Sequence, residues 1–178
     1  MECNAVFRTE RAWIEVSAEN LRHNARVLQE AMPAGCELMA VVKCEAYGHG
    51  LRQMAEELQS AGVRAFAVAT IEEGIKLREY GIQGEILILG YTDVRRAPEL
   101  KQYDLIQTLI DFCYAKELDE QGADVKVHIK IDTGMHRLGI PYHASSDVGQ
   151  VFAMKHIKVC GMFTHLCCPD SRLLEDIG

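Results

Sequence analysis

Six short apolar runs, rich in β-branched residues, recur along the chain, and helical patterns fill the intervals between them. Runs of this length and composition predict β-strands. Strands that alternate with helices are typical of repeated βα units around a parallel sheet. The predicted strands are Leu38–Lys43, Ala65–Ala69, Glu85–Gly90, Asp104–Leu109, Val125–Ile131 and Ile157–His165.

The predicted helices carry recognisable end signals. Ser17 can cap the first helix, because its hydroxyl can accept a backbone N–H of the first turn. Thr70–Glu73 has the form of a capping box, and Asp111 can open a later helix that Gly122 closes. Pro98 suits the first turn of a short helix. The apolar face of the first helix is formed by Leu21, Ala25, Leu28 and Met32.

The fifth predicted strand alternates strictly between apolar and basic residues. Its apolar face consists of Val125, Val127, Ile129 and Ile131, and its other face of Lys126, His128 and Lys130. One solvated sheet face explains this pattern. In a closed barrel, however, the second face points into the interior, and Lys130 then lies inside near the carboxyl end of the strand. The pattern leaves both interpretations open.

No linker or low-complexity segment divides the chain, so we expect a single domain over residues 1–178. Only six strands are visible, whereas a barrel of this kind closes with eight, so two edges of the sheet would stay open. Pro169–Ser171 is followed by helix-forming residues, which predicts the start of a further helix. We therefore interpret the chain as a barrel domain that is truncated at its carboxyl side.

Composition is that of a globular protein, with 48% hydrophobic and 25% charged residues. The formal net charge of -7, without a basic block, argues against nucleic acid and anionic membranes as partners. The apolar runs are too short to cross a bilayer, and the first residues lack the apolar core of an export signal. We expect a cytoplasmic protein that contains no membrane segment.

The chain has seven cysteines, an odd number, and none of them forms a CxxC pair. A secreted disulfide framework normally has an even count in a shorter chain. We expect reduced thiols packed as small hydrophobic side chains. A metal site is not expected, because the adjacent Cys167 and Cys168 beside His165 give poor ligand geometry without a second pair.

The sharpest local signal is the segment from Val41 to Gly50, VVKCEAYGHG. It places Lys43 at the end of an apolar strand, before a tight loop with two glycines, a tyrosine and a histidine. A lysine in a dry site has a lowered pKa and can act as a nucleophilic amine toward an aldehyde cofactor. The spacing alone favours a lysine that merely ends a strand in water, because lysines are common at strand ends.

This segment resembles the cofactor-lysine motif of the alanine racemase family, and the match extends from about Arg11 to the end of the chain. Further resemblance lies in AFAVATIEE from Ala65, ILILG from Ile86, HIKIDTGMHRLG from His128 and GMFTHL from Gly161. The Cys44 and Glu45 positions, and the start at Arg11, look most like the serine/alanine racemase domains associated with vancomycin resistance. The resemblance implies an α/β fold, the parallel (β/α)8 barrel of the family's N-terminal domain, with about six of its eight strands present.

The resemblance also implies roles for individual residues. Lys43 matches the lysine that binds pyridoxal 5'-phosphate and acts as one racemising base. Tyr47 matches a phosphate-holding tyrosine, and His165 a histidine beside the pyridine ring. Arg137 matches the arginine that meets the cofactor's phenolic oxygen and the substrate carboxylate. Lys130 matches a lysine that is carbamylated in many members, which converts a buried cation into an anion facing Arg137.

Racemisation needs a base on each face of the substrate's α-carbon. In the family the second base is a tyrosine of a C-terminal domain, supplied by the partner subunit of a homodimer. No match to it lies in the 178 residues, so we expect the chain alone to be inactive and its parent protein to be an isomerase. That enzyme would interconvert L- and D-alanine, or serine, for peptidoglycan. The alternative is another barrel-type pyridoxal-phosphate protein, either an amino-acid decarboxylase or a cofactor-homeostasis protein.

Overall fold

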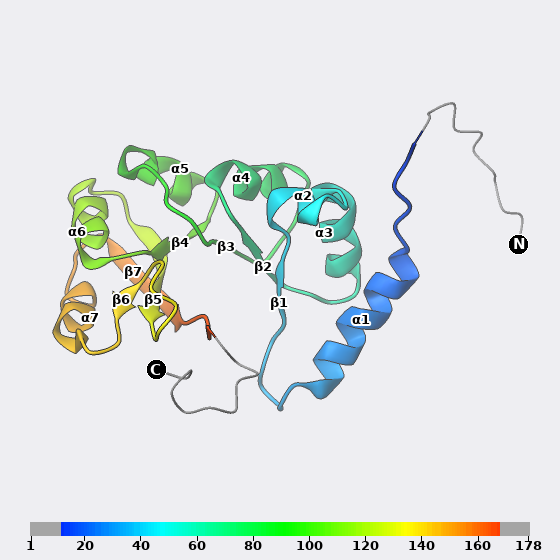
Figure 1. Cartoon of the computed structure of the whole chain (residues 1–178). Helices are drawn as coiled ribbons and strands as arrows, with labels where there is room; N and C mark the ends of the chain where they lie inside the picture. Colours follow the sequence, from blue (N-terminus) through cyan, green and yellow to red (C-terminus); the bar gives the residue numbers. More distant parts are fainter. Residues whose placement is uncertain (1–11, 168–178) are drawn as a thin grey trace, which may run out of the picture.

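The computed structural model describes residues 12–167 as a curved sheet with helices along its outer side (Figure 1). Every strand pair in this range is parallel, and the strands follow the order β1-β2-β3-β4-β5, with β7 also paired to β5. The six long strands are β1 Met39–Val41, β2 Ala65–Val68, β3 Glu85–Ile88, β4 Ile106–Leu109, β5 Val125–Asp132 and β7 Ile157–Phe163.

All six predicted strands are therefore present, with ends that differ by a few residues. The prediction missed one short strand, β6 Ile140–Pro141, which pairs in parallel with the carboxyl end of β5. The first strand is shorter than expected, because the chain leaves the sheet before Lys43 and enters a turn. Asp104 adopts a left-handed conformation with φ 50° and so lies outside β4.

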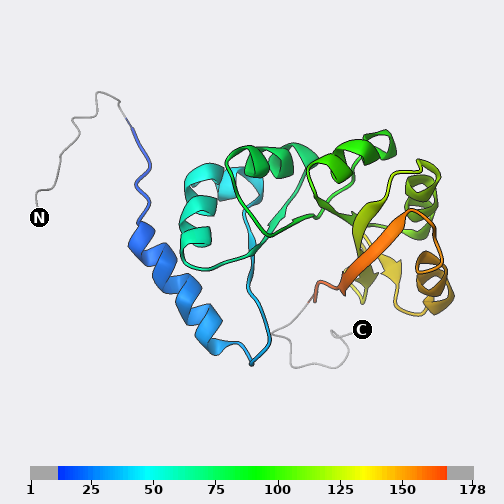
Figure 2. The same ribbon diagram turned by 180° about the vertical axis from the view of Figure 1, so that it is seen from behind.

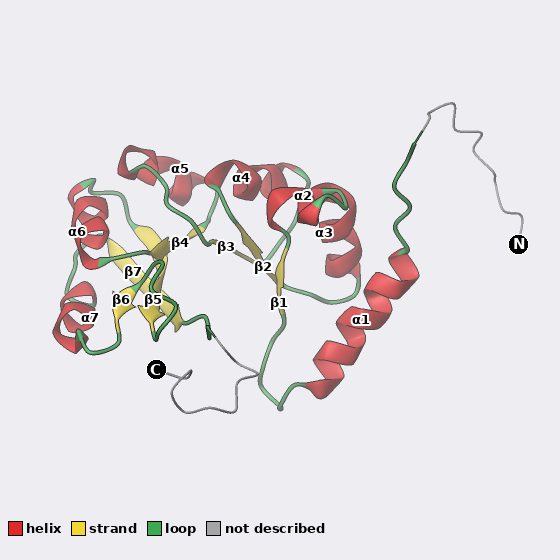
Figure 3. Ribbon diagram, viewed as in Figure 1, coloured by secondary structure: helices red, strands yellow, loops and turns green. Residues whose placement is uncertain are grey.

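The helices from α3 to α7 cover the convex side of the sheet, which is most easily followed from behind and in the colouring by secondary structure (Figures 2 and 3). The helix α1 lies alongside α3. The helices of the described residues are α1 Ala18–Ala31, α2 Lys43–Tyr47, α3 Leu51–Ser60, α4 Ile71–Glu79, the 3-10 helix η1 Val94–Arg96, α5 Ala97–Gln102, α6 Phe112–Glu120 and α7 Ser145–Val151.

The predicted helix ends are confirmed by their hydrogen bonds. The hydroxyl of Ser17 accepts the Asn20 N–H, and the carboxylate of Asp111 accepts the Tyr114 N–H. Thr70 and Glu73 form both halves of the capping box at the start of α4. Pro98 lies in the first turn of α5. Each of these side-chain hydrogen bonds satisfies a backbone N–H that the helix itself leaves unpaired.

The main core lies between the sheet and its helices, and β5 shows how the two sheet faces differ. Val125, Val127 and Ile129 are completely buried against the helices. On the opposite, concave face, the side chain of Lys130 is only 4% exposed. The prediction of a solvated basic face is therefore wrong at Lys130, and the prediction that this residue lies on the inner side of a barrel holds. A smaller apolar cluster on the concave face is formed by Ala67, Leu87 and Ile106 with Met39, Leu89 and Phe163.

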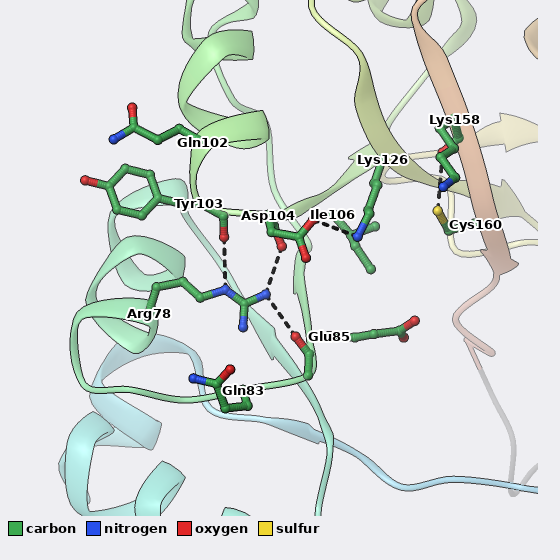
Figure 4. Close-up of a pocket in the computed structure, with 11 residues that line it drawn as sticks. Arg78, Gln83, Glu85, Gln102, Tyr103, Asp104, Ile106, Lys126, Lys158 and Cys160 are labelled. Carbon is green, nitrogen blue, oxygen red and sulfur yellow. Dashed lines mark hydrogen bonds and ion pairs between the residues drawn. The ribbon is translucent and has the colours of Figure 1, made fainter.

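At the amino ends of the strands, the guanidinium of Arg78 joins two loops (Figure 4). It donates hydrogen bonds to the backbone carbonyls of Ile82, Gly84, Tyr103 and Asp104 at 2.8 to 3.0 Å. Arg78 thus fastens the loop before β3 to the loop before β4. These contacts are structural and lie at the end of the sheet opposite to the predicted chemistry.

Three further predictions concern the last helix, membrane-spanning segments and the cysteines. The helix start at Pro169–Ser171 lies outside the described residues. Within residues 12–167, no helix has the length and apolar character that spanning a membrane requires. The expectation of packed thiols is wrong for Cys36, Cys44, Cys113 and Cys160, because these free cysteines are exposed.

Candidate active site

Lys43 lies half-buried where β1 ends. The segment labelled α2, which begins at this residue, is an unusual left-handed turn. Cys44, Glu45, Ala46 and Tyr47 have φ values of 54°, 54°, 51° and 56°, so all four adopt the left-handed helical conformation. For residues other than glycine this conformation is unfavourable, and single occurrences are already uncommon. Four in succession require strong support from the surrounding structure.

Part of that support comes from the turn itself. The N–H of Ala46 donates to the Val42 carbonyl at 2.9 Å, and the Ala46 side chain is only 4% exposed. The Glu45 carboxylate accepts the N–H of Leu51 at 3.2 Å and so caps α3. Gly48, with φ 87°, ends the turn. Tyr47 consequently projects from the turn with 61% of its surface exposed.

Lys130 approaches the same region from β5. Its Nζ donates a hydrogen bond to the Leu138 carbonyl at 2.8 Å. Burial lowers the pKa of Lys130, the carboxylate of Asp132 opposes that change, and the Arg137 cation lowers the pKa further. A buried amine that is held by a neutral carbonyl and lies near another cation loses its proton more easily than a surface lysine does. Lys130 is thus a more nucleophilic amine than a surface lysine.

Arg137 lies on the loop between β5 and β6, and Asp132 organises that loop. The Asp132 Oδ1 atom accepts the backbone N–H groups of Gly134 at 3.1 Å and His136 at 2.9 Å. These hydrogen bonds, that of His136 foremost, lower the pKa of Asp132 to about 2. Gly139 has φ 117° and its N–H donates to the Ile110 carbonyl, which returns the loop to the sheet. The exposed Arg137 side chain is therefore carried by a well-defined turn.

His165 follows the carboxyl end of β7. The neighbouring hydroxyl of Thr164 donates to the Ile131 carbonyl at 2.8 Å and lies 2.7 Å from the Thr133 hydroxyl. These two contacts join the end of β7 to the end of β5. His165 itself is exposed.

All five sequence-predicted site residues line one cavity of about 570 Å³ at the carboxyl ends of the strands. Polar groups enter it from β1, β5, β7 and the loop after β5, while the wall between them is apolar. The predicted residues in the lining are Lys43, Tyr47, Lys130, Arg137 and His165. The apolar wall includes Met39, Val41, Ala67, Ala69, Leu87, Leu89, Met162 and Phe163.

Sequence reasoning gave no role to His128, which also lines this cavity. Its ring lies 6.4 Å from the ring of Phe163 and is half-buried. Burial lowers the pKa of His128, which favours the neutral imidazole, and the distant Glu85 carboxylate opposes this. The alternation of β5 placed His128 on the concave face, but it could not distinguish a cavity residue from one in solvent.

The cavity combines a lysine and an arginine whose charged groups are available to a ligand. Within residues 12–167, neither the Lys43 amine nor the Arg137 guanidinium makes a hydrogen bond or ion pair. An unpaired amine can react with an aldehyde, and a guanidinium binds carboxylate or phosphate by two parallel hydrogen bonds. The apolar wall suits a flat ring. The arrangement therefore fits an aromatic aldehyde together with an acidic substrate.

Comparisons with known proteins identify the family to which this chain is related. The sequence profile of the family described as alanine racemase, N-terminal domain, matches residues 16–176. An amino-acid racemase of Enterococcus faecalis is 56% identical over 96% of this chain, and a serine/alanine racemase of Enterococcus gallinarum is 40% identical over 93%. The chain spans only 24% of the length of each of these two relatives.

Among solved structures, alanine racemases share the fold of this chain. The crystal structure of an alanine racemase from E. faecalis superposes with a TM-score of 0.82 at 33% identity, over 90% of this chain and 45% of that one. The α/β barrel fold predicted from the sequence is thereby confirmed, with the sheet of the described residues left open between β1 and β7.

Proposed function

The chain belongs to the alanine racemase family, and from that premise we propose that residues 1–178 form the cofactor-binding barrel domain of an amino-acid racemase. The enzyme interconverts L- and D-alanine, or L- and D-serine, with pyridoxal 5'-phosphate as cofactor. The observation that carries the proposal is the convergence of Lys43, Arg137 and Lys130 on one cavity at the carboxyl ends of parallel strands.

Four residues of the cavity suit the cofactor and the substrate. Lys43 would supply the amine for the cofactor aldehyde, Tyr47 would hold the phosphate, and His165 would lie beside the pyridine ring. Arg137 binds the phenolic oxygen and the substrate carboxylate. When bound, pyridoxal phosphate withdraws electrons from the amino acid and so acidifies its α-proton.

The proton transfer itself belongs to side chains. Lys43 Nζ takes the α-proton on one face of the substrate, and a second base returns a proton on the opposite face. That second base comes from another subunit, so the working enzyme is a homodimer. Arg137 keeps the α-carbon in place between the two bases by holding the carboxylate.

Lys130 supports Arg137 after carbamylation. Its amine attacks CO2, a C–N bond forms, and the proton that leaves the nitrogen goes to solvent. The product is an anion that faces the Arg137 cation, so a repulsive pair becomes an attractive one. The lowered pKa of Lys130 favours this step, because only the unprotonated amine attacks.

The cellular role follows from the product. D-Alanine and D-serine are building blocks of peptidoglycan precursors, which are made in the cytoplasm. We place the enzyme there, with a small-molecule amino acid as its substrate.

The test begins with the cofactor lysine. Pyridoxal phosphate is added to the protein that carries this chain, borohydride fixes the adduct, and peptide mapping locates it. We expect the label on Lys43 and its loss in Lys43→Ala, whereas Lys155→Ala, which removes an exposed lysine, keeps it. Label on another lysine refutes the assignment. Chiral chromatography of L-alanine and L-serine after incubation then tests racemisation, and decarboxylated products would favour a barrel-type decarboxylase instead.

A further inference from the structure

Glu73 does more than the capping box requires. One of its carboxylate oxygens, Oε2, accepts the backbone N–H groups of Ala69 at 2.8 Å and Thr70 at 3.4 Å. The Glu73 N–H in turn donates to the Thr70 hydroxyl at 3.4 Å. These contacts complete the cap of α4. The other oxygen, Oε1, is not needed for the cap.

That second oxygen reaches the turn that follows Lys43. It accepts the backbone N–H of Cys44 at 2.6 Å, across 29 positions of sequence. Cys44 is the first of the four left-handed residues and directly follows Lys43. One carboxylate thus joins the carboxyl end of β1 to that of β2, with Lys43 at the junction.

Few contacts from outside the turn compete with this one. Apart from the contact of Lys76 with Glu45, the other hydrogen bonds of residues 44–47 are formed within residues 42–51, between Val42 and Ala46 for example. The ion pair of Lys76 with Glu45 also comes from α4, but its 3.5 Å separation and half-exposed side chains make it weak. A hydrogen bond from a backbone N–H to a carboxylate is considerably stronger.

We infer that Glu73 is a positioning residue for Lys43: its carboxylate fixes the first residue of the left-handed turn and so sets the direction in which the Lys43 amine enters the cavity. The inference rests on the proposed function of Lys43. It adds a residue that touches neither cofactor nor substrate and acts through the backbone.

The chemistry requires a carboxylate rather than an amide. Three N–H donors face the two oxygens of Glu73, and an ionised carboxylate is an acceptor at both. In Glu73→Gln one oxygen becomes an NH2 group, which faces a backbone N–H in either orientation of the amide. The substitution therefore loses the contact with Cys44 or the contact with Ala69 while keeping the size of the side chain.

Two control variants separate positioning from general effects on α4. Glu72→Gln removes the same charge from the first turn of the same helix, but Glu72 pairs with Arg96 and does not contact the turn. Thr70→Ala weakens the cap without touching Cys44. A simple effect of charge or of capping would therefore appear in a control as well as in Glu73→Gln.

The first readout is hydrogen exchange of the Cys44 amide in the protein that carries this chain. We expect exchange to accelerate about tenfold or more in Glu73→Gln, because a hydrogen bond to a charged group is lost. Exchange at Cys44 should stay unchanged in Glu72→Gln and Thr70→Ala. Equal protection of Cys44 in Glu73→Gln and in the unsubstituted protein overturns the inference.

The second readout is the rate at which pyridoxal phosphate and borohydride label Lys43. We expect this rate to fall about tenfold or more in Glu73→Gln, measured at a temperature at which the variant is fully folded, since a misplaced reactive group loses rate steeply. Both controls should label at the rate of the unsubstituted protein. An unchanged rate in Glu73→Gln sinks the positioning role alone, whereas absence of label on Lys43 in the unsubstituted protein sinks the proposed function.

Discussion

The side-chain carboxylate of Asp132 accepts the backbone N–H of His136, 2.9 Å away, and thereby folds the loop that carries Arg137. Asp132 is the last residue of β5, so the loop is anchored to the sheet at the point where it leaves it. His136 has φ 52°, a value that residues other than glycine rarely adopt unless the surrounding structure stabilises it. The position of Arg137 therefore depends on the ionised state of Asp132.

This dependence predicts a particular response to acid. The pKa of Asp132 is about 2 in the folded protein against an ordinary value of 3.8, so the folded state binds its proton less readily than the unfolded state. The stabilisation by the ionised carboxylate is complete above the ordinary value and is lost as the pH falls through about 2. We expect the carboxyl carbon resonance of Asp132 to show it still largely ionised at about pH 3.

The control for this titration is Asp132→Asn. The amide N–H of His136 should report the same protonation by its chemical shift in the unsubstituted protein, and this acid shift should vanish in the variant. Protonation of Asp132 at its ordinary value would show that the two N–H contacts do not hold the carboxylate in solution.

Carbamylation of Lys130 gives the second prediction. With ¹³C-labelled bicarbonate we expect a carbamate resonance from the protein, since the buried amine of Lys130 has a lowered pKa and faces Arg137. The resonance should disappear in Lys130→Ala. It should persist in Lys126→Ala. Lys126 lies on the same face of β5 as Lys130, but its amine is paired with the Asp104 carboxylate. A signal that survives in Lys130→Ala contradicts the assignment.

The third prediction concerns Gly161, which leaves room for the ring of His128. A Cβ atom at Gly161 would lie 2.8 Å from the His128 Nε2 atom. We expect Gly161→Ala to destabilise the protein by roughly 1–3 kcal/mol, because the added methyl group forces the half-buried His128 ring out of its place. Denaturant unfolding measures the change in the free energy of unfolding.

A double variant tests the cause of that loss. If the clash with His128 is responsible, His128→Ala should recover most of it in the Gly161→Ala background. Gly149→Ala is the matched control: nothing lies within 4 Å of its added Cβ, and its position in α7 favours alanine by up to about 1 kcal/mol. Additive losses in the double variant would exclude the clash.

Short apolar runs were sufficient to predict the six long strands, and capping residues predicted the helix ends, because both signals depend on residues that are near in sequence. The alternation of β5 also predicted which residues face the concave side. Other features depend on distant partners. The left-handed turn after Lys43 contradicts the local preference of its residues, and β6 is too short, at Ile140–Pro141, to show any periodicity. Thr70–Glu73 was visible as a cap, whereas the contact with Cys44 was not.

The fourth prediction concerns Arg78, whose guanidinium joins the loops before β3 and β4 through four backbone carbonyls. Arg78→Met keeps the apolar stem but removes every donor, and we expect a loss on the order of 2–4 kcal/mol in the free energy of unfolding. Arg78→Lys should lose nearly as much, because a single ammonium cannot reproduce the planar fork. Arg95→Met, which removes an exposed arginine paired with Asp93, should leave stability close to unchanged.

Since the Arg78 contacts lie at the amino ends of the strands, labelling of Lys43 should persist in Arg78→Met under folding conditions. A variant that unfolds normally but no longer labels Lys43 would show that the two ends of the sheet are coupled.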